Sequence, residues 1–281
     1  MNLKFPLDDV KVQQVKNAKK VAEPLYADNF WQMNQNEFAM QVEGVADFYA
    51  CDGKEVEYGP VYGSDLNSME LYLNGSVYGA VLHQRKILPM HGSSFRHKGS
   101  SVIICGDAGA GKSSLTASFF LNGADFLTDD VTPVIFRDSI PYIWALSDRI
   151  KLWADTLEQF EIKKTGLPRV HPDVDKYYLS MRGGDGGMYR LDRILILQHS
   201  EEREVTFKEL TGTHKFAAVR SEIYRPEYLL GMPENVPVYF SQTVEICKHV
   251  RVFEVNRPAK IMVSELHEEI LDKLGGLLSE S

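Results

Sequence analysis

The chain has 281 residues, of which 44% are hydrophobic and 25% are charged, an ordinary composition for a globular protein. This length permits one large domain or two small ones around a sizeable hydrophobic core. The net charge of −8 and the sequence pI near 5.5 argue against a nucleic-acid partner, which needs a basic face, although a local basic groove is compatible with them.

Cysteine usage and hydropathy indicate the compartment. The three cysteines, Cys51, Cys105 and Cys247, form no C-x-x-C pair and no zinc-ligand spacing. No segment approaches the ~18 apolar residues of a membrane span, and residues 1–9 lack the apolar core of a secretory signal. We therefore expect a soluble protein of the reducing cytoplasm, without a membrane partner.

The N-terminal part of the chain is expected to be rich in strands. Residues 1–25 contain valines that fit helical spacing only in part, so a helix is compatible with this segment but weakly supported. Alternating segments separated by Gly-containing turns follow at residues 37–42, 46–51 and 54–58. This pattern is typical of an antiparallel meander. It predicts a small β-rich N-terminal lobe over residues 1–86 and a second domain over residues 87–281.

A helix is predicted over residues 68–84, where apolar residues recur at an imperfect spacing of three to four. Ser68 can cap its N-terminus, and Pro89 ends the helix or the link that follows it. His83 lies on this helix. Because a lone histidine carries no metal geometry, we expect a surface or packing residue rather than a ligand.

Two strands and a glycine-rich loop come next. His91 opens a strand, residues 92–95, that we expect to pair as a hairpin with the apolar run of residues 102–105. Residues 106–113, GDAGAGKS, then match the phosphate-binding pattern G-x-x-x-x-G-K-[ST]. In such a loop glycines allow dihedral angles closed to other residues, so that successive N–H groups turn inward around a phosphate. The alternative is a glycine-rich turn that matches the pattern by chance.

The pattern also predicts what the residues of the loop do. Lys112 would place its ammonium on the β- and γ-phosphates, and Ser113 would place its hydroxyl on Mg²⁺. A helix over residues 114–121 would point its N-terminal dipole at the same phosphates. The residues expected to contact the nucleotide are Gly106, Asp107, Ala108, Gly109, Ala110, Gly111, Lys112, Ser113 and Ser114.

A pair of carboxylates follows this helix. Residues 124–128 are predicted to form a strand that ends in Asp129-Asp130, and carboxylates at the carboxyl end of such a strand lie where α/β sheets bind ligands. One of them can hold a metal, directly or through water. Adjacent residues of a strand point to opposite faces, so both can serve the site only if the chain is turning there, as Thr132-Pro133 indicates. The alternative is an acidic turn with no ligand role.

The order of His91-Gly92, residues 106–113, Gly123 and Asp129-Asp130-Val131 resembles the catalytic domain of HPr kinase/phosphorylase. It equally resembles the shorter relatives of that family, the HPr-kinase-like serine kinases, several of which occur in peptide-modification gene clusters. The resemblance covers residues 68–155. It implies an α/β fold with a P-loop kinase core of the HPr kinase/PEP carboxykinase type, beside the smaller N-terminal lobe.

The resemblance also implies a set of catalytic residues. ATP would lie on the P-loop, held in part by Lys112, with Mg²⁺ on Ser113 and Asp130. Asp129 would be the acid/base next to the acceptor hydroxyl, and His91 would lie near the transferred phosphate. The near-neutral pKa of a histidine would let His91 tune Asp129 or contact that phosphate.

The sequence also departs from the family pattern. The E-[IV]-R-G signature is not found after the aspartate pair; residues 149–155, RIKLWAD, instead resemble the K-L-W segment of the shorter relatives. This departure favours a kinase over a phosphorylase and does not point to HPr as the acceptor. Lys151 and Asp155 are candidates for supporting the phosphate and the metal, with a solvated helix start as the equal alternative.

The remaining residues continue an alternating α/β pattern. We expect strands at residues 134–136, 142–146, 191–197, 205–210 and 250–255, helices at 154–160, 211–224 and 264–278, a loop at 168–175 and a turn-rich segment at 226–237. Residues 181–188 are glycine-rich, and the segment including residues 183–187 is either a lid or substrate-binding loop, or a plain surface loop. In the first case Arg182 or Arg190 could reach a phosphate.

These observations predict an ATP-dependent kinase that transfers the γ-phosphoryl group to a hydroxyl, most plainly serine of a peptide or protein. A kinase of small hydroxylated metabolites and a nucleotide-binding regulatory module with little turnover are the alternatives. A third hypothesis gives the main function to the N-terminal lobe and makes the nucleotide a stabiliser. The sequence leaves the acceptor and the oligomeric state open, a homo-oligomer included.

Overall fold

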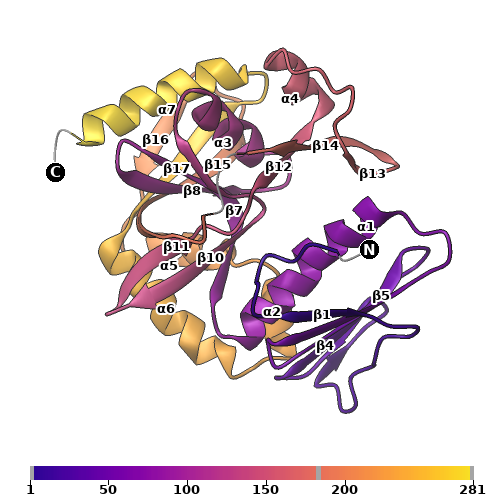
Figure 1. Ribbon diagram of the computed structural model, residues 1–281. Helices are drawn as coiled ribbons and strands as arrows, with labels where there is room; N and C mark the ends of the chain where they lie inside the picture. The colour runs from indigo at the N-terminus through magenta and orange to yellow at the C-terminus, as the bar shows by residue number, and fades with distance from the viewer. Residues whose placement is uncertain (1–2, 182–184, 279–281) are drawn as a thin grey trace.

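The computed structural model describes residues 3–181 and 185–278 (Figure 1). In this part of the chain the protein is a mixed α/β structure whose strands form three sheets, of six, eight and three strands. Helices α1 (Leu66–Tyr72) and α2 (Tyr78–Gln84) lie between the six-stranded sheet and the rest of the molecule, as Figure 1 shows. None of the helices described here is long and apolar enough to cross a membrane.

The N-terminal residues form the six-stranded sheet, in the order β1-β6-β5-β4-β3-β2. Its strands are β1 (Lys11–Gln14), β2 (Tyr26–Ala27), β3 (Trp31–Met33), β4 (Glu37–Val42), β5 (Ala46–Cys51) and β6 (Glu55–Pro60). The predicted antiparallel meander is confirmed as β4-β5-β6. The helix considered for residues 1–25 is wrong: Val12 pairs with Val56 in the parallel edge contact of β1 with β6.

The predicted helix over residues 68–84 begins earlier than expected. Its N-cap is Asp65, whose carboxylate accepts a hydrogen bond from the Ser68 N–H at 2.8 Å. Ser68, the residue expected to be the cap, is therefore in the first turn. The helix is also interrupted, because a π-helical turn, η1 (Leu73–Val77), separates α1 from α2. Such turns are rare and are frequently found at functional sites.

His83 lies on α2 and is a packing residue, as expected. Its side chain is fully buried, and its Nε2 lies 2.9 Å from the carbonyl oxygen of Tyr224. Burial lowers the pKa of His83 to about 4, so its ring is neutral at pH 7. The contact joins α2 to a segment about 140 residues further along the chain, which also forms one wall of the site described below.

The eight-stranded sheet is the centre of the molecule. Its strands are β7 (Leu88–His97), β8 (Ser100–Gly106), β9 (Asp125–Thr128), β10 (Val131–Arg137), β11 (Ile140–Trp144), β15 (Met188–Ser200), β16 (Thr206–Glu209) and β17 (Arg251–Pro258). They follow the order β11-β10-β7-β8-β15-β17-β16, with β9 paired to β7. The predicted hairpin is confirmed as β7 and β8, and β15 pairs in parallel with both β8 and β17.

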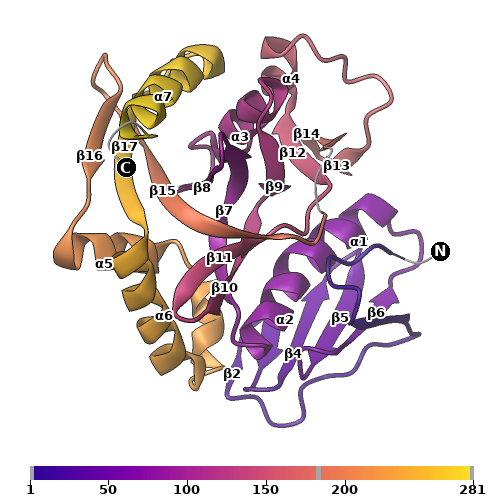
Figure 2. The ribbon, with the colours of Figure 1, turned by 60° about the vertical axis from the view of Figure 1, so that its left-hand side comes forward.

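Both faces of the central strands are buried, which explains their nearly continuous apolar sequence. Along β8, Val102 and Ile104 face the helices α3 (Lys112–Leu121) and α7 (Val263–Leu278). The alternate residues Ile103 and Cys105 face α5 (Gly212–Ser221) and α6 (Asn235–His249). Figure 2 shows these helix pairs on opposite sides of the sheet.

A small third sheet lies next to α3. It comprises β12 (Arg149–Trp153), β13 (Arg169–His171) and β14 (Val174–Ser180), and α4 (Ala154–Gln159) follows β12 directly. The loop expected over residues 168–175 is therefore wrong. Arg169 and His171 pair with β14 across a register shift, so the turn is confined to the two residues between the strands.

Among the C-terminal helices, α6 was not predicted. The turn-rich segment at residues 226–237 contains a short 3₁₀ helix, η2 (Pro226–Leu230), and the start of α6 at Asn235, in spite of Pro237. Proline is tolerated in the first turn of a helix, because the N–H groups there have no partner within the helix. The predicted helices at residues 154–160, 211–224 and 264–278 are present as α4, α5 and α7 with small changes of bounds.

Candidate functional site

The glycine loop, residues 106–111, connects the end of β8 to the start of α3 at the edge of the central sheet. Gly106 has a φ of 128°, and a Cβ at this position would overlap the carbonyl oxygen of Leu197 on β15. Only glycine fits this close approach. The Lys112 side chain turns back along the loop, and its Nζ donates to the carbonyl oxygens of Gly106 at 2.6 Å and Asp107 at 3.1 Å. The loop thus keeps its lysine ammonium at the N-terminus of α3.

Arg257, at the end of β17, donates hydrogen bonds to the same loop. Its Nε donates to the carbonyl oxygen of Ala110 at 2.7 Å, and its Nη2 lies 3.4 Å from the carbonyl oxygen of Gly109. These bonds satisfy carbonyl groups on the outer side of the turn. Within the loop, the Gly106 N–H donates to the Glu222 carboxylate at 3.0 Å and the Ala110 N–H to the Asp107 carbonyl at 3.1 Å. The sequence pattern gave no indication of Arg257, which lies 146 residues beyond Gly111.

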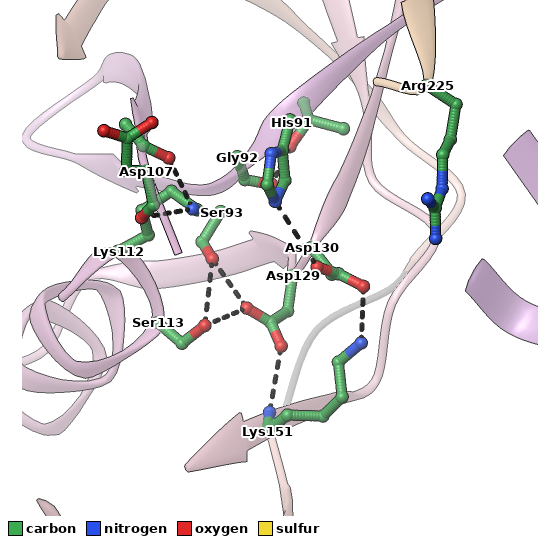
Figure 3. A network of polar contacts seen from close by, with 12 residues as sticks. His91, Gly92, Ser93, Asp107, Lys112, Ser113, Asp129, Asp130, Lys151 and Arg225 are labelled. Atoms are coloured by element: carbon green, nitrogen blue, oxygen red, sulfur yellow. Dashed lines mark hydrogen bonds and ion pairs between the residues drawn. The ribbon is translucent and has the colours of Figure 1, made fainter. Parts of the chain in front are cut away.

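Asp129 is held by three hydrogen-bond donors (Figure 3). Its Oδ1 accepts from the hydroxyls of Ser113 at 2.7 Å and Ser93 at 2.6 Å. Its Oδ2 accepts from the backbone N–H of Lys151 at 2.9 Å. The Asp129 residue is only 8% exposed. The family resemblance implied that Asp129 is the base beside the acceptor hydroxyl. In the structure Asp129 instead accepts a hydrogen bond from Ser113, the serine of the glycine loop.

Asp130 faces the other way. Its φ of 70° is unusual for a residue other than glycine, and the turn makes room for two adjacent carboxylates in one site. Its Oδ2 accepts from the Lys151 Nζ at 2.6 Å, and its Oδ1 lies 3.9 Å from the His91 Nε2. Burial alone would raise the pKa of Asp130, but the Lys151 ammonium outweighs it and holds that pKa well below its usual range. Asp130 is thus ionised at neutral pH.

Two lysines and a histidine complete the charges around the pair. Burial would lower the pKa of Lys151, but the Asp130 carboxylate outweighs burial and raises it. Burial lowers the pKa of Lys176, on β14, although Asp129 opposes the effect. Burial and the Lys112 ammonium lower the pKa of His91, so its ring is neutral at pH 7. The sequence analysis identified Lys151 and His91 but not Lys176, which lies on a strand that was not predicted.

Asp130 and His91 line a pocket of about 510 Å³. Its opposite wall contains Gly75 and Ser76 of η1 and the segment Ser221–Glu227 between α5 and η2. Arg225 belongs to this wall, and Figure 3 shows it across Asp130 from the glycine loop. Sequence analysis missed this residue, because no local pattern connects it to the loop.

The remaining predicted residues lie outside this cluster. The Ser114 hydroxyl contacts the Thr156 hydroxyl at 3.0 Å, and Asp155 accepts the Thr156 N–H at 2.6 Å, as a helix-start residue does. Arg190 is exposed and lies 3.8 Å from Asp192. Arg182 and the glycines of residues 183–184 fall outside the described residues.

The donor atoms fit a magnesium nucleotide. Ser113 and Asp129 supply a hydroxyl and a carboxylate oxygen 2.7 Å apart, and Mg²⁺ prefers one or two protein oxygens completed by phosphate and water oxygens. Lys112 is held at the loop, Lys151 bonds to Asp130, and Lys176 is near enough to feel the charge of Asp129. A site with these groups can hold a polyphosphate next to a metal and can place an ionised carboxylate beside a second ligand.

No protein-family model matches the chain, and no curated protein matches it. Among solved structures, the chain is similar to the HPr(Ser) kinase/phosphatase from Coxiella burnetii, with 14% sequence identity and a TM-score of 0.36. The similarity covers 69% of this chain and 99% of that chain. It is too distant to carry an argument about this protein, so the proposals below depend on the geometry of the residues described above.

Proposed function

We propose that the protein is an ATP-dependent kinase that transfers the γ-phosphoryl group to a hydroxyl acceptor. One observation carries the proposal: the Ser113 hydroxyl of the glycine loop bonds to Asp129, while the adjacent Asp130 faces a pocket large enough for an acceptor. A nucleotide-holding loop alone does not need a second carboxylate that faces a pocket. A kinase does need one, because the acceptor hydroxyl must be oriented and must lose a proton.

The loop side of the site would hold the nucleotide. The N–H groups of residues 107–111 and the Lys112 ammonium would surround the phosphates, with the α3 N-terminus behind them. Ser113 and Asp129 would hold Mg²⁺, which when bound neutralises the charge of the phosphate oxygens. Lys151 and Lys176 add charge from β12 and β14, where negative charge builds up during transfer.

The two aspartates would have the opposite roles from those that the family resemblance implied. Ser113 bonds to Asp129 and not to Asp130, so we assign the metal to Asp129. Asp130 lines the pocket and is ionised, so we assign to it the acceptor hydroxyl. Its low basicity suits phosphoryl transfer with a loose transition state, in which the proton leaves late and positioning dominates.

His91 would help to shape this half of the site. Its ring is neutral and lies 3.9 Å from Asp130 Oδ1, so it can hydrogen-bond the carboxylate or the transferred phosphate without adding charge. Its backbone N–H donates to the carbonyl oxygen of Glu222 at 2.7 Å, which fixes β7 against the opposite wall of the pocket.

The test compares the two aspartates in one assay with γ-labelled ATP, Mg²⁺ and a panel of serine-containing peptides, HPr, free serine and other hydroxylated metabolites. We expect Lys112→Ala to remove transfer to every acceptor. Asp129→Asn should raise the Mg²⁺ concentration needed for half-maximal rate. Asp130→Asn should leave ATP and Mg²⁺ binding unchanged and lower kcat by about 10²- to 10⁴-fold.

Asp138→Asn is the matched control, because Asp138 is exposed on the turn between β10 and β11. Transfer at the parent rate in Asp130→Asn would contradict the assignment of the acceptor side. Tight ATP binding with no labelled acceptor in the whole panel would instead favour a nucleotide-binding regulatory module.

A further inference from the structure

The pocket beside Asp130 has a size and a shape that limit its occupant. Its volume of about 510 Å³ lies within the range of about 300–1,000 Å³ typical of small-molecule sites. Asp130, His91, Arg225 and Ser76 all line it, and Figure 3 shows Arg225 on the side of Asp130 away from the glycine loop. An acceptor that places its hydroxyl on Asp130 therefore presents its remaining polar groups to the opposite wall.

The opposite wall is fixed by close packing. Tyr224 is buried, and its ring lies against α2 so closely that a Cβ on Gly79 would be 2.8 Å from the ring. The π-helical turn η1 brings Gly75 to the same side chain, so that a Cβ on Gly75 would lie 3.4 Å from the Tyr224 hydroxyl. Residue 225 follows this fixed ring directly. Its side chain is consequently presented at a defined place.

Arginine is an unusual residue for the backbone conformation found at position 225. Its φ of 51° is in the left-handed region, which glycine and asparagine adopt far more readily than arginine, and Pro226 follows it. Residues held in such conformations cluster at ligand sites. The guanidinium stacks over the rings of Trp31 and Tyr224, at 5.3 and 5.6 Å from their centroids. Stacking holds the plane of the group without using its N–H donors.

Those donors are poorly used among the residues that the structure describes. The contacts of Arg225 with the Glu227 carboxylate and the Ser76 hydroxyl are each 3.4 Å, at the long limit of a hydrogen bond. Its Nε is buried and has no hydrogen-bond partner in that part of the chain. A stacked guanidinium with donors to spare matches a carboxylate, which it can bind through two parallel hydrogen bonds.

The position of Arg225 separates it from the nucleotide phosphates. In Figure 3 Lys112 and Ser113 lie on one side of Asp130, and Arg225 lies on the other. The loop side already has a cation of its own, the Lys112 ammonium. An anion bound by Arg225 therefore belongs to the acceptor.

We propose that the acceptor is a small hydroxylated compound that carries a carboxylate, and that Arg225 binds this carboxylate while Asp130 binds the hydroxyl. The proposal rests on the kinase function proposed above and names its substrate class. In the reaction the acceptor O–H bond breaks and the proton passes to Asp130. The acceptor oxygen forms a bond to the γ-phosphorus, the bond from that phosphorus to the β–γ bridging oxygen breaks, and ADP leaves with the electron pair.

The experiment measures kcat/KM for pairs of acceptors that differ in one carboxylate. L-Serine is compared with ethanolamine, and glycerate with glycerol, with γ-labelled ATP and the full chain. We expect the carboxylated member of each pair to be preferred by about 10- to 100-fold. A peptide that ends in serine, with a free or an amidated C-terminus, tests the same chemistry from a second source. A capped peptide with an internal serine tests a protein acceptor.

Variants of Arg225 connect the preference to this side chain. Arg225→Gln should reduce the ratio between the paired acceptors to nearly one, chiefly by lowering kcat/KM for L-serine and glycerate. Arg225→Lys, which keeps the charge, should retain part of the ratio. Arg137→Gln is the matched control, because Arg137 is exposed at the end of β10. It should retain the full ratio.

The outcomes separate this inference from the kinase function. Transfer with no carboxylate preference, efficient labelling of the capped peptide, or an unchanged ratio in Arg225→Gln would overturn the inference and leave the kinase function standing. If no compound is labelled, ligand-observed NMR with a non-hydrolysable ATP analogue decides. Broadening of L-serine signals over those of ethanolamine, lost in Arg225→Gln, supports the pocket, and its absence overturns it.

Discussion

The two walls of the candidate site are held in different ways. On the loop side, Asp129 accepts three hydrogen bonds of 2.6–2.9 Å and Lys112 is anchored to the carbonyls of its own loop. On the pocket side, Arg225 is strained in its backbone and its polar contacts are 3.4 Å long. The polar groups of the loop side make short hydrogen bonds within the protein, whereas the N–H donors of Arg225 on the pocket side make only long ones within the described part of the chain. We infer that the loop side determines the chemistry and the pocket side the choice of acceptor.

The largest expected effect tests the rigidity of the loop side. Gly106→Ala would place a methyl group against the Leu197 carbonyl, which belongs to the backbone of a central strand and cannot move aside. The left-handed conformation and the overlap together should lower the free energy of unfolding by about 2–5 kcal/mol and abolish ATP binding. Urea denaturation and ATP titration measure the two effects.

Gly99→Ala is the control for that change, because Gly99 also has a positive φ but a Cβ there meets nothing within 4 Å. It should cost about 1 kcal/mol and leave ATP binding unchanged. Equal losses in the two variants would mean that backbone conformation, not the contact with β15, limits the loop.

A second prediction concerns the joint between the walls, where Lys151 bonds to both carboxylates. Lys151→Met keeps the backbone N–H on Asp129 and removes the ammonium from Asp130. Burial of Asp130 is then opposed only by the weaker effects of His91 and Lys176, so its pKa should rise. The acid limb of the pH profile of kcat should move upward by about 1–3 pH units.

The direction in which the pH profile moves follows from the direction of the Asp130 pKa shift. In the parent, the pKa of Asp130 is lower in the folded protein than in the unfolded chain. The ionised carboxylate therefore stabilises the fold fully above the unfolded pKa, and this stabilisation is lost as the pH falls through the folded pKa. The variant should therefore lose activity at pH 5–6 and retain more of it near pH 8. Lys163→Met, at an exposed lysine, is the control, and an acid limb that stays in place would show that Asp130 does not titrate in the reaction.

The smallest effect is expected on the pocket side. Gly79→Ala would bring a methyl group to 2.8 Å from the Tyr224 ring, which is buried and has to shift. Alanine gains about 1 kcal/mol of helix propensity over glycine, against about 1–3 kcal/mol for overpacking, so a net loss of about 1 kcal/mol should appear as a lower Tm.

Gly75→Ala provides the comparison, since its Cβ would be at an ordinary 3.4 Å from the Tyr224 hydroxyl. It should be neutral or stabilising. If Gly79→Ala proves more stable than the parent protein, the pocket wall yields more easily than its packing indicates, and Arg225 is not held at a defined place.

The loop side was predictable because its residues are close in the sequence. Gly106, Lys112, Ser113 and the aspartate pair lie within 25 residues, and each has a signal that depends on local geometry. Which aspartate meets Ser113 was not predictable. The left-handed turn at Asp130 decides it, and no sequence pattern marks a non-glycine residue that adopts a positive φ.

The pocket side was predictable only in part: the family resemblance pointed to His91 and Asp130, whereas Ser76 and Arg225 come from distant segments without a local signal. Ser76, His91, Asp130 and Arg225 span about 150 residues, and only the tertiary fold brings them together. The same limit explains Arg257 under the glycine loop and Lys176 near the carboxylates. Many of the strands were identified from alternation and apolar runs, whereas β12, β13, β14 and the helix α6 were not predicted.

One attachment in this wall matters for how such a protein changes over evolution. The segment of residues 222–224 is joined to β7 through main-chain groups: the His91 N–H donates to the Glu222 carbonyl at 2.7 Å and the Tyr224 N–H to the Pro89 carbonyl at 2.8 Å. Any residue except proline can donate such a bond, whatever its side chain. Substitutions at positions 225 and 227 therefore leave the segment in place. Related chains could acquire new acceptors here without rebuilding the catalytic half.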